Sequence, residues 1–189
     1  MIDRRQILRA LAALACGASA SPALAQGVSR ITAYGFTFPG LHGGEVRLGD
    51  FAGRPIMVVN TASLCGNTPQ YAGLQELWTE FRDRGLMIIG VPSNDFGNQE
   101  PGGAAEIEAV AHGQFAVGFP MTAKTVVKGP GAHPFYKWAA EARPRDLPRW
   151  NFHKYLVGRD GYLAESFADT LQPTDTRIRT ALARALTAA

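Results

Sequence analysis

The residue with the clearest chemical potential is Cys65, one of two cysteines in a chain of 189 residues. It stands between a β-branched run, 56–60, and a segment of helical periodicity that begins near Thr68. Functional groups gather at the carboxyl ends of strands in open α/β sheets, and the amino end of a helix stabilises a thiolate. This placement favours a nucleophilic thiolate over a buried spectator cysteine, which would more naturally lie within a strand.

The second cysteine, Cys16, lies in a segment with the order of an export signal. Arginines precede an Ala/Leu-rich stretch, and Ala23-Leu24-Ala25 then offers the small-x-small pattern that signal peptidase recognises. We expect residues 1–25 to be removed and the protein to be exported to the bacterial periplasm. The pair Arg4-Arg5 favours a twin-arginine route over ordinary secretion. The alternative is an N-terminal helix packed on the domain. After cleavage, Cys65 would have no partner for an internal disulfide.

The rest of the chain, 26–189, has the composition of one globular domain. In the full sequence, 46% of the residues are hydrophobic and 19% are charged. Without the signal, the 19 basic and 16 acidic residues fall to 16 and 15, because three arginines and one aspartate leave. This near-neutral balance gives no reason to expect nucleic-acid binding. No apolar run in it is long enough for a transmembrane helix, so we expect no stable membrane insertion after cleavage.

The elements that must position Cys65 form an α/β pattern. Strands are expected at 35–38, 45–48, 56–60, 86–91, 155–157 and 163–167, and helices at 68–84, 103–114, 134–142 and 174–186. Strand, helix and strand around Cys65 form a right-handed crossover, so strands 56–60 and 86–91 should be parallel. The prediction is a mixed central sheet flanked by helices, with an N-terminal β-hairpin extension.

Three segments resemble the signatures of the glutathione peroxidase family in its cysteine form. They are 59–71 (VNTASLCGNTPQY), 94–102 (NDFGNQEPG) and 150–157 (WNFHKYLV), and shorter matches lie at 129–137 between the second and the third. The similarity covers about residues 30–175 in the right order and spacing. Three ordered motifs are far more specific than one. The resemblance implies a thioredoxin-like fold.

The resemblance also implies a mechanism. Cys65 would attack the O–O bond of hydrogen peroxide or an organic hydroperoxide and become a sulfenic acid. Gln99, Trp150 and Asn151 match the family's other catalytic positions, and their N–H groups can donate hydrogen bonds to the thiolate and the peroxide oxygens. Taken singly, these three would be a loop residue, a core aromatic and a turn former. The implied chemistry uses no cofactor.

Two departures from the family concern the reductant and the assembly. The positions where many members carry a second, resolving cysteine hold Ala111 and Ser93 here. An external thiol, glutathione or a thioredoxin-like protein, would therefore reduce the sulfenic acid. The stretch 142–150 is too short for the insertion that tetrameric members use in assembly, which indicates a monomer. The four histidines, at 42, 112, 133 and 153, have no ligand-like spacing, so no metal site is predicted.

Two other functions remain open from the sequence. The segment 65–69 (CGNTP) has the outline of a thioredoxin active site whose second cysteine has become threonine. A monothiol disulfide reductase or isomerase is therefore one alternative, although it would have no need for Gln99 and Trp150-Asn151. A redox sensor that passes on a signal through a mixed disulfide is the other. Catalytic consumption of peroxide separates the peroxidase from both.

Overall fold

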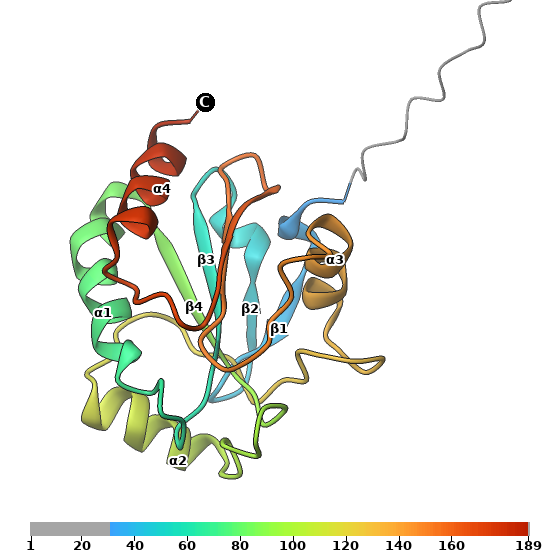
Figure 1. Ribbon diagram of the computed structural model, residues 1–189, viewed down its shortest axis with the longest axis vertical. Coiled ribbons are helices and arrows are strands. Elements are labelled where there is room, and N and C mark those ends of the chain that lie inside the picture. Colours follow the sequence, from blue (N-terminus) through green and yellow to red (C-terminus); the bar gives the residue numbers. More distant parts are fainter. Residues whose placement is uncertain (1–30, 189) are drawn as a thin grey trace, which may run out of the picture. The chain divides into compact units, whose positions relative to one another are not determined.

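The computed structural model describes residues 31–188 (Figure 1). The predicted signal, 1–25, and Cys16 lie outside the described residues. The strands are β1 (Thr37–Pro39), β2 (Glu45–Arg47), β3 (Ile56–Thr61), β4 (Met87–Pro92), β5 (Lys154–Val157) and β6 (Leu163–Phe167), and the α-helices are α1 (Gln70–Phe81), α2 (Ala104–Glu108), α3 (Pro134–Ala142) and α4 (Thr176–Thr187). Among these residues, no helix is long and apolar enough to cross a membrane.

The central sheet has the strand order β4-β3-β5-β6. Strands β3 and β4 are parallel, as predicted from the crossover, whereas β5 runs antiparallel to both β3 and β6. Every residue of β3 and β4 is buried, which fits their continuous apolar runs. The β5–β6 hairpin turns at Gly161, whose φ of 80° suits glycine. The separate β1–β2 hairpin is antiparallel.

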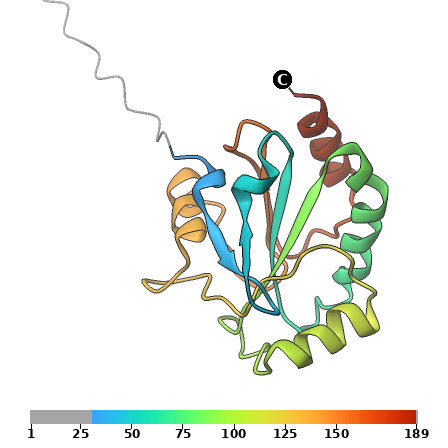
Figure 2. The same ribbon diagram turned by 180° about the vertical axis from the view of Figure 1, so that it is seen from behind.

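Helices lie on both faces of the sheet. In both views of the ribbon, α1 and α4 lie side by side on one face, where Arg179 of α4 pairs with Glu76 and Glu80 of α1 (Figures 1 and 2). On the opposite face α3 packs against β5, with the rings of Phe135 and Tyr155 6.2 Å apart. The predicted mixed sheet flanked by helices, with its N-terminal hairpin, is confirmed.

Two of the predicted helices differ in detail. The helix expected at 68–84 begins as α1 at Gln70, because the residues from Cys65 to Pro69 form successive turns, and it ends in a 3₁₀ turn, Arg82–Arg84, before Gly85. The helix expected at 103–114 is α2 followed by a π-helix, Ala109–Gln114. Apolar periodicity marks a helix in both cases but does not distinguish the wider π turn.

Candidate active site

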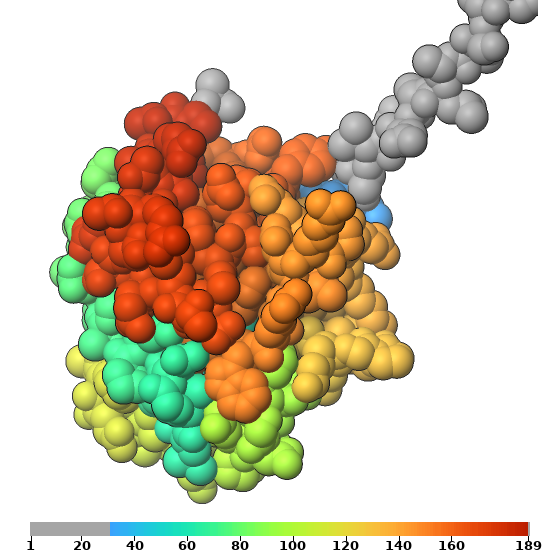
Figure 3. Space-filling model, viewed as in Figure 1, coloured from blue at the N-terminus to red at the C-terminus, as the bar shows by residue number. Residues whose placement is uncertain are grey.

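The ends of β3, β4 and β5 meet at one end of the sheet and bring the predicted residues together. Cys65 follows the carboxyl end of β3, and Gln99 follows the carboxyl end of its parallel neighbour β4. Trp150 and Asn151 precede the amino end of β5, which lies at the same edge because β5 is antiparallel to β3. In the space-filling view, part of the orange segment that leads into β5 lies between the blue-green segment that follows β3 and the yellow-green segment that follows β4 (Figure 3). We call Cys65, Gln99, Trp150 and Asn151 the cysteine site.

The Cys65 sulfur is held in the turns before α1. Cys65 is only 7% exposed, and the backbone N–H of Asn67 donates a hydrogen bond to Sγ at 3.3 Å. The Thr68 hydroxyl accepts from the backbone N–H of Cys65 at 3.0 Å and donates to the Ala62 carbonyl at 2.9 Å. A backbone N–H directed at the sulfur can stabilise negative charge that the sulfur carries in a reaction, because hydrogen bonds to a charged acceptor are the stronger ones.

Asn151 connects the cysteine segment to Gln99. Its backbone carbonyl accepts a hydrogen bond from Asn67 Nδ2 at 3.3 Å, and its own Nδ2 donates to Gln99 Oε1 at 3.0 Å. The Gln99 backbone carbonyl accepts from the N–H of Leu64, next to Cys65, at 3.0 Å. Among the described residues, Gln99 Nε2 has no hydrogen-bond partner. Asn151, which is fully buried, therefore orients Gln99 so that the glutamine amide is free to donate.

The Asn151 amide has two hydrogen-bond acceptors in the structure. Its Nδ2 donates to Gln99 and, at 3.4 Å, to the Phe96 carbonyl, rather than to the sulfur. Both N–H groups are occupied by these two acceptors. In this arrangement the Asn151 side chain holds the Gln99 amide and has no N–H left to donate elsewhere.

Trp150 is the exposed member of the cysteine site. Its side chain is 38% exposed, and its ring lies 6.1 Å from that of buried Phe96. Its backbone is held by Asn60, whose Nδ2 donates to the Trp150 carbonyl at 3.0 Å. The ring lies so close over Gly97 that a β-carbon there would be 3.1 Å from Cη2, and Gly97 also has a φ of 66°. Glycine at this position allows the close approach.

Glu100 fixes the strand end before Cys65, a role that its position in the sequence does not indicate. One carboxylate oxygen accepts hydrogen bonds from both the backbone N–H and the hydroxyl of Ser63, at 2.9 and 3.1 Å. Burial raises the pKa of Glu100, and the hydrogen bonds from Ser63 oppose that rise. Glutamate is rarely buried, so a loop glutamate gives little sign of such a role in a sequence. The Thr68 hydroxyl was missed as well, although a threonine just before a helix is a capping signal.

No second thiol lies near the sulfur within the described residues, 31–188, where Cys65 is the single cysteine. Ser93 follows β4 and Ala111 lies in the π-helix, and both are fully buried. The structure therefore offers no residue in this range that could form a disulfide with Cys65.

The four histidines do not form one group. His133 stacks on Phe38, with ring centroids 4.0 Å apart, and His153 is hydrogen-bonded to Ser166 Oγ at 3.0 Å. Burial lowers the pKa of both histidines, that of His153 to about 4. The other two, His42 and His112, lie on the surface on either side of a carboxylate. We call His42, Glu108 and His112 the histidine cluster.

Comparison with known proteins gives one consistent family. A model of the family described as glutathione peroxidase matches residues 33–140. A hydroperoxy fatty acid reductase of Synechocystis sp. is 42% identical over 154 residues, which cover 76% of this chain and 90% of the relative. A glutathione peroxidase of Lactococcus lactis is 39% identical, over 75% of this chain and 92% of the relative.

Solved structures agree on the fold. The crystal structure of Trgpx in apo form superposes with a TM-score of 0.69 and 32% identity, over 84% of this chain and 97% of the other. A thiol:disulfide interchange protein of the thioredoxin family from Chlorobium tepidum gives a TM-score of 0.62 over 82% of this chain and 95% of the other. Its identity is 13%, so this second likeness concerns the fold alone. The thioredoxin-like fold is confirmed.

Proposed function

The chain belongs to the glutathione peroxidase family and is a thiol-dependent peroxidase, and we propose that Cys65 is the residue that attacks the peroxide. The observation that carries this proposal is the hydrogen bond from the Asn67 N–H to the Cys65 sulfur, beside a Gln99 amide held by Asn151. A disulfide reductase would share the donor to the sulfur but would have no need for Gln99 and Trp150, whose N–H groups suit the departing oxygen of a peroxide.

The first half of the reaction oxidises Cys65. The thiolate sulfur attacks one peroxide oxygen, the O–O bond breaks, and the departing oxygen takes up a proton and leaves as water or an alcohol. Cysteine loses two electrons and becomes a sulfenic acid, and the peroxide gains two electrons. Negative charge develops on the departing oxygen, so the free amide of Gln99 and the indole N–H of Trp150 stabilise this step.

The second half regenerates the thiol with external reductants. One thiol attacks the sulfenic sulfur and releases water, which leaves a mixed disulfide with Cys65. A second thiol then attacks the mixed disulfide, frees Cys65 and leaves as part of a disulfide. We propose that glutathione or a thioredoxin-like protein supplies both thiols. The absence of a second cysteine within residues 31–188 supports an external reductant.

The surface around the sulfur favours apolar hydroperoxides as well as hydrogen peroxide. Leu64, next to Cys65, is 66% exposed, and Trp150 is 38% exposed. Two exposed apolar side chains beside a reactive group can contact the hydrocarbon part of an organic substrate. The Synechocystis relative carries the name of a hydroperoxy fatty acid reductase. Leu64→Ser should lower kcat/KM for a fatty-acid hydroperoxide and leave that for hydrogen peroxide unchanged.

Steady-state kinetics test the proposal directly. Peroxide consumption by the mature protein is measured in parallel with glutathione, thioredoxin and dithiothreitol, and with Cys65→Ser as the matched control. The peroxidase consumes peroxide catalytically with at least one of the three thiols, and the control does not. Catalytic consumption of a disulfide without consumption of peroxide would replace the proposal with the reductase function.

The oxidised protein provides a second test. After one equivalent of hydrogen peroxide, mass spectrometry of the monomer should show sulfenic acid or its further oxidation products. A loss of two hydrogens from the intact monomer would instead indicate a second covalent partner for the sulfur. A peptide that joins Cys65 to Cys16 would then show an internal disulfide, and therefore that Cys16 is retained. Size-exclusion chromatography with light scattering tests the monomeric state, which we propose from the short stretch 142–150.

We also propose that the protein works in the bacterial periplasm. The support is the N-terminal sequence, in which arginines precede an apolar stretch and a cleavage pattern at Ala23-Leu24-Ala25. N-terminal sequencing of the secreted protein should begin at Gln26. Replacement of Arg4-Arg5 by two lysines should block export if the twin-arginine route is used, and should leave export intact if the general route is used.

A further inference from the structure

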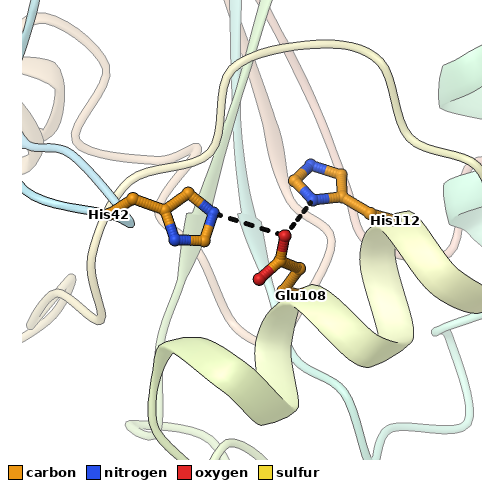
Figure 4. A group of neighbouring side chains, drawn as sticks. All are labelled: His42, Glu108 and His112. Carbon is orange, nitrogen blue, oxygen red and sulfur yellow. Dashed lines mark ion pairs between the residues drawn. The ribbon is translucent and has the colours of Figure 1, made fainter.

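The histidine cluster joins two parts of the chain that are distant in sequence (Figure 4). His42 lies in the loop between β1 and β2, Glu108 is the last residue of α2, and His112 lies in the π-helix that follows. Nε2 of His42 is 3.7 Å from Glu108 Oε1, and Nδ1 of His112 is 3.8 Å from the same oxygen. The three ligand atoms all lie within 4.8 Å of one another.

The backbone on both sides of the histidine cluster is well fixed. The His42 loop is closed by the Gly40 N–H, which donates to the Gly44 carbonyl at 3.0 Å, and it is anchored by the N–H of buried Leu41, which donates to the Met121 carbonyl at 3.2 Å. Glu108 and His112 are four residues apart on a helix, which places their side chains on one face. The π turn around His112 is a feature that often marks functional sites in helices.

The distances do not describe a hydrogen-bonded ion pair. At 3.7 and 3.8 Å, both nitrogen–oxygen separations exceed hydrogen-bond length. Exposed ion pairs of this kind contribute little to stability, so pairing alone gives no reason for two imidazoles to converge on one carboxylate oxygen. Zinc ligands lie about 2.0–2.1 Å from the metal, which separates two ligand atoms of a tetrahedral site by about 3.3 Å. Small rotations of these partly exposed side chains would bring the three atoms to that spacing.

We propose that His42, Glu108 and His112 bind a divalent transition-metal ion, with zinc as the representative ion. Two imidazoles and one carboxylate are ligands that suit zinc, whereas magnesium and calcium prefer oxygen ligands throughout. A groove of about 370 Å³ lies beside His42 and His112, bounded by the β1–β2 hairpin and by Phe119 and Met121. This groove leaves room for water or an external ligand in the fourth position.

The bound ion would tie the β1–β2 hairpin to the end of α2. Because the three ligands come together only in the folded chain, zinc binding stabilises the folded state by mass action. The site therefore has a readout that does not depend on peroxidase activity, which keeps this inference separate from the proposed function.

The test uses tag-free protein with Cys65→Ser, so that the reactive thiol cannot bind the metal. Equilibrium dialysis and thermal unfolding are followed with zinc chloride, in parallel with magnesium chloride. We expect one zinc ion per chain, a rise in the unfolding temperature that EDTA reverses, and no response to magnesium. His42→Ala, Glu108→Gln and His112→Ala should each lower the zinc affinity at least about tenfold, because each removes one of three ligands.

Glu141→Gln is the matched control, since Glu141 is an exposed carboxylate on α3 outside the histidine cluster. It should bind zinc as tightly as the parent protein. Absence of zinc binding to the parent overturns the proposal. Equal zinc affinity in the parent and in all three ligand variants overturns it as well, because the ion would then bind elsewhere.

Discussion

The cysteine site and the histidine cluster differ in how their side chains are held. In the cysteine site, hydrogen bonds of 3.0–3.3 Å join the turn of Cys65 to Asn151 and Gln99. In the histidine cluster the two nitrogen–oxygen separations are 3.7 and 3.8 Å, and two of the three side chains are at least half exposed. A group that reacts with a small peroxide needs its geometry before the substrate arrives, whereas exposed ligands can close on an ion as it binds. The cysteine site is therefore preorganised, whereas the side chains of the histidine cluster are free to adjust.

The largest effect on activity is expected from replacement of Cys65, the central residue of the cysteine site. Cys65→Ser should abolish peroxide consumption and leave the fold intact, because a serine hydroxyl is not ionised near neutral pH. Peroxide consumption and circular dichroism are measured on the same preparation. A folded variant that retains most of the activity would contradict the assignment of Cys65 as the nucleophile.

Removal of the positioned amide is expected to have the next largest effect. Gln99→Ala should slow oxidation of Cys65 by peroxide, because one preorganised donor to developing charge is lost. Such a loss typically costs on the order of 10²–10³ in rate. Stopped-flow oxidation of the reduced protein measures this step alone. Trp150→Phe is the companion variant, since it removes the indole N–H and keeps most of the packing on Phe96.

Alkylation by iodoacetamide separates two roles of these donors. The Asn67 N–H already reaches the sulfur, so the reactivity of the sulfur towards iodoacetamide should depend only in part on Gln99 and Trp150. We expect a moderate loss of alkylation rate and a larger loss of peroxide rate in both variants. Wild-type oxidation rates in both would mean that the two side chains are not donors in the reaction.

Two kinds of signal in the sequence indicated the residues of the cysteine site. Cys65 stood out because it lies between a strand and a helix, whereas Gln99, Trp150 and Asn151 were indicated by the resemblance to the glutathione peroxidases. Their hydrogen bonds could not be predicted, and Asn151 donates to Gln99 rather than to the sulfur. The histidine cluster escaped notice because no spacing within the sequence links His42 to residues 108–112. The cluster forms only in the folded chain, where the β1–β2 hairpin contacts the end of α2.

The buried histidine His153 should make the free energy of unfolding depend on pH. Burial lowers the pKa of His153 from 6.5 to about 4, the charge of Lys154 adds to this effect, and Asp146 opposes it. Between pH 6.5 and 4 the unfolded chain therefore binds more protons at this residue than the folded chain. Stability from neutral His153 is fully present above pH 6.5 and is lost as the pH falls towards 4. The loss amounts to roughly 3 kcal/mol of the free energy of unfolding.

Urea unfolding at a series of pH values checks this expectation. His153→Gln is the reference, because an amide can keep the hydrogen bond with Ser166 and does not titrate. Other groups titrate alike in both proteins, so the difference between the two curves isolates His153. Parallel curves from pH 7 to pH 4 would show that burial of His153 has no such effect on stability.

The smallest effect concerns Glu100, which acts on Cys65 only through the backbone. Glu100→Ala removes the acceptor of both hydrogen bonds from Ser63 and should loosen the strand end that leads to Cys65. We expect peroxide oxidation to slow about tenfold, since loss of one outer hydrogen-bonding partner misplaces a reactive group without removing it. The burial of Glu100 also predicts a lower free energy of unfolding in this variant.

Glu100→Gln distinguishes positioning from charge. The glutamine carbonyl can still accept from Ser63, so this variant should recover most of the rate that Glu100→Ala loses. If Glu100 mattered through its negative charge, Glu100→Gln would instead behave like Glu100→Ala. Peroxide oxidation and iodoacetamide alkylation are compared for the two variants at one pH. A wild-type oxidation rate in folded Glu100→Ala would mean that the turn around Cys65 keeps its geometry without the carboxylate. Preorganisation of the cysteine site would then rest on Asn67, Thr68 and Asn151 alone.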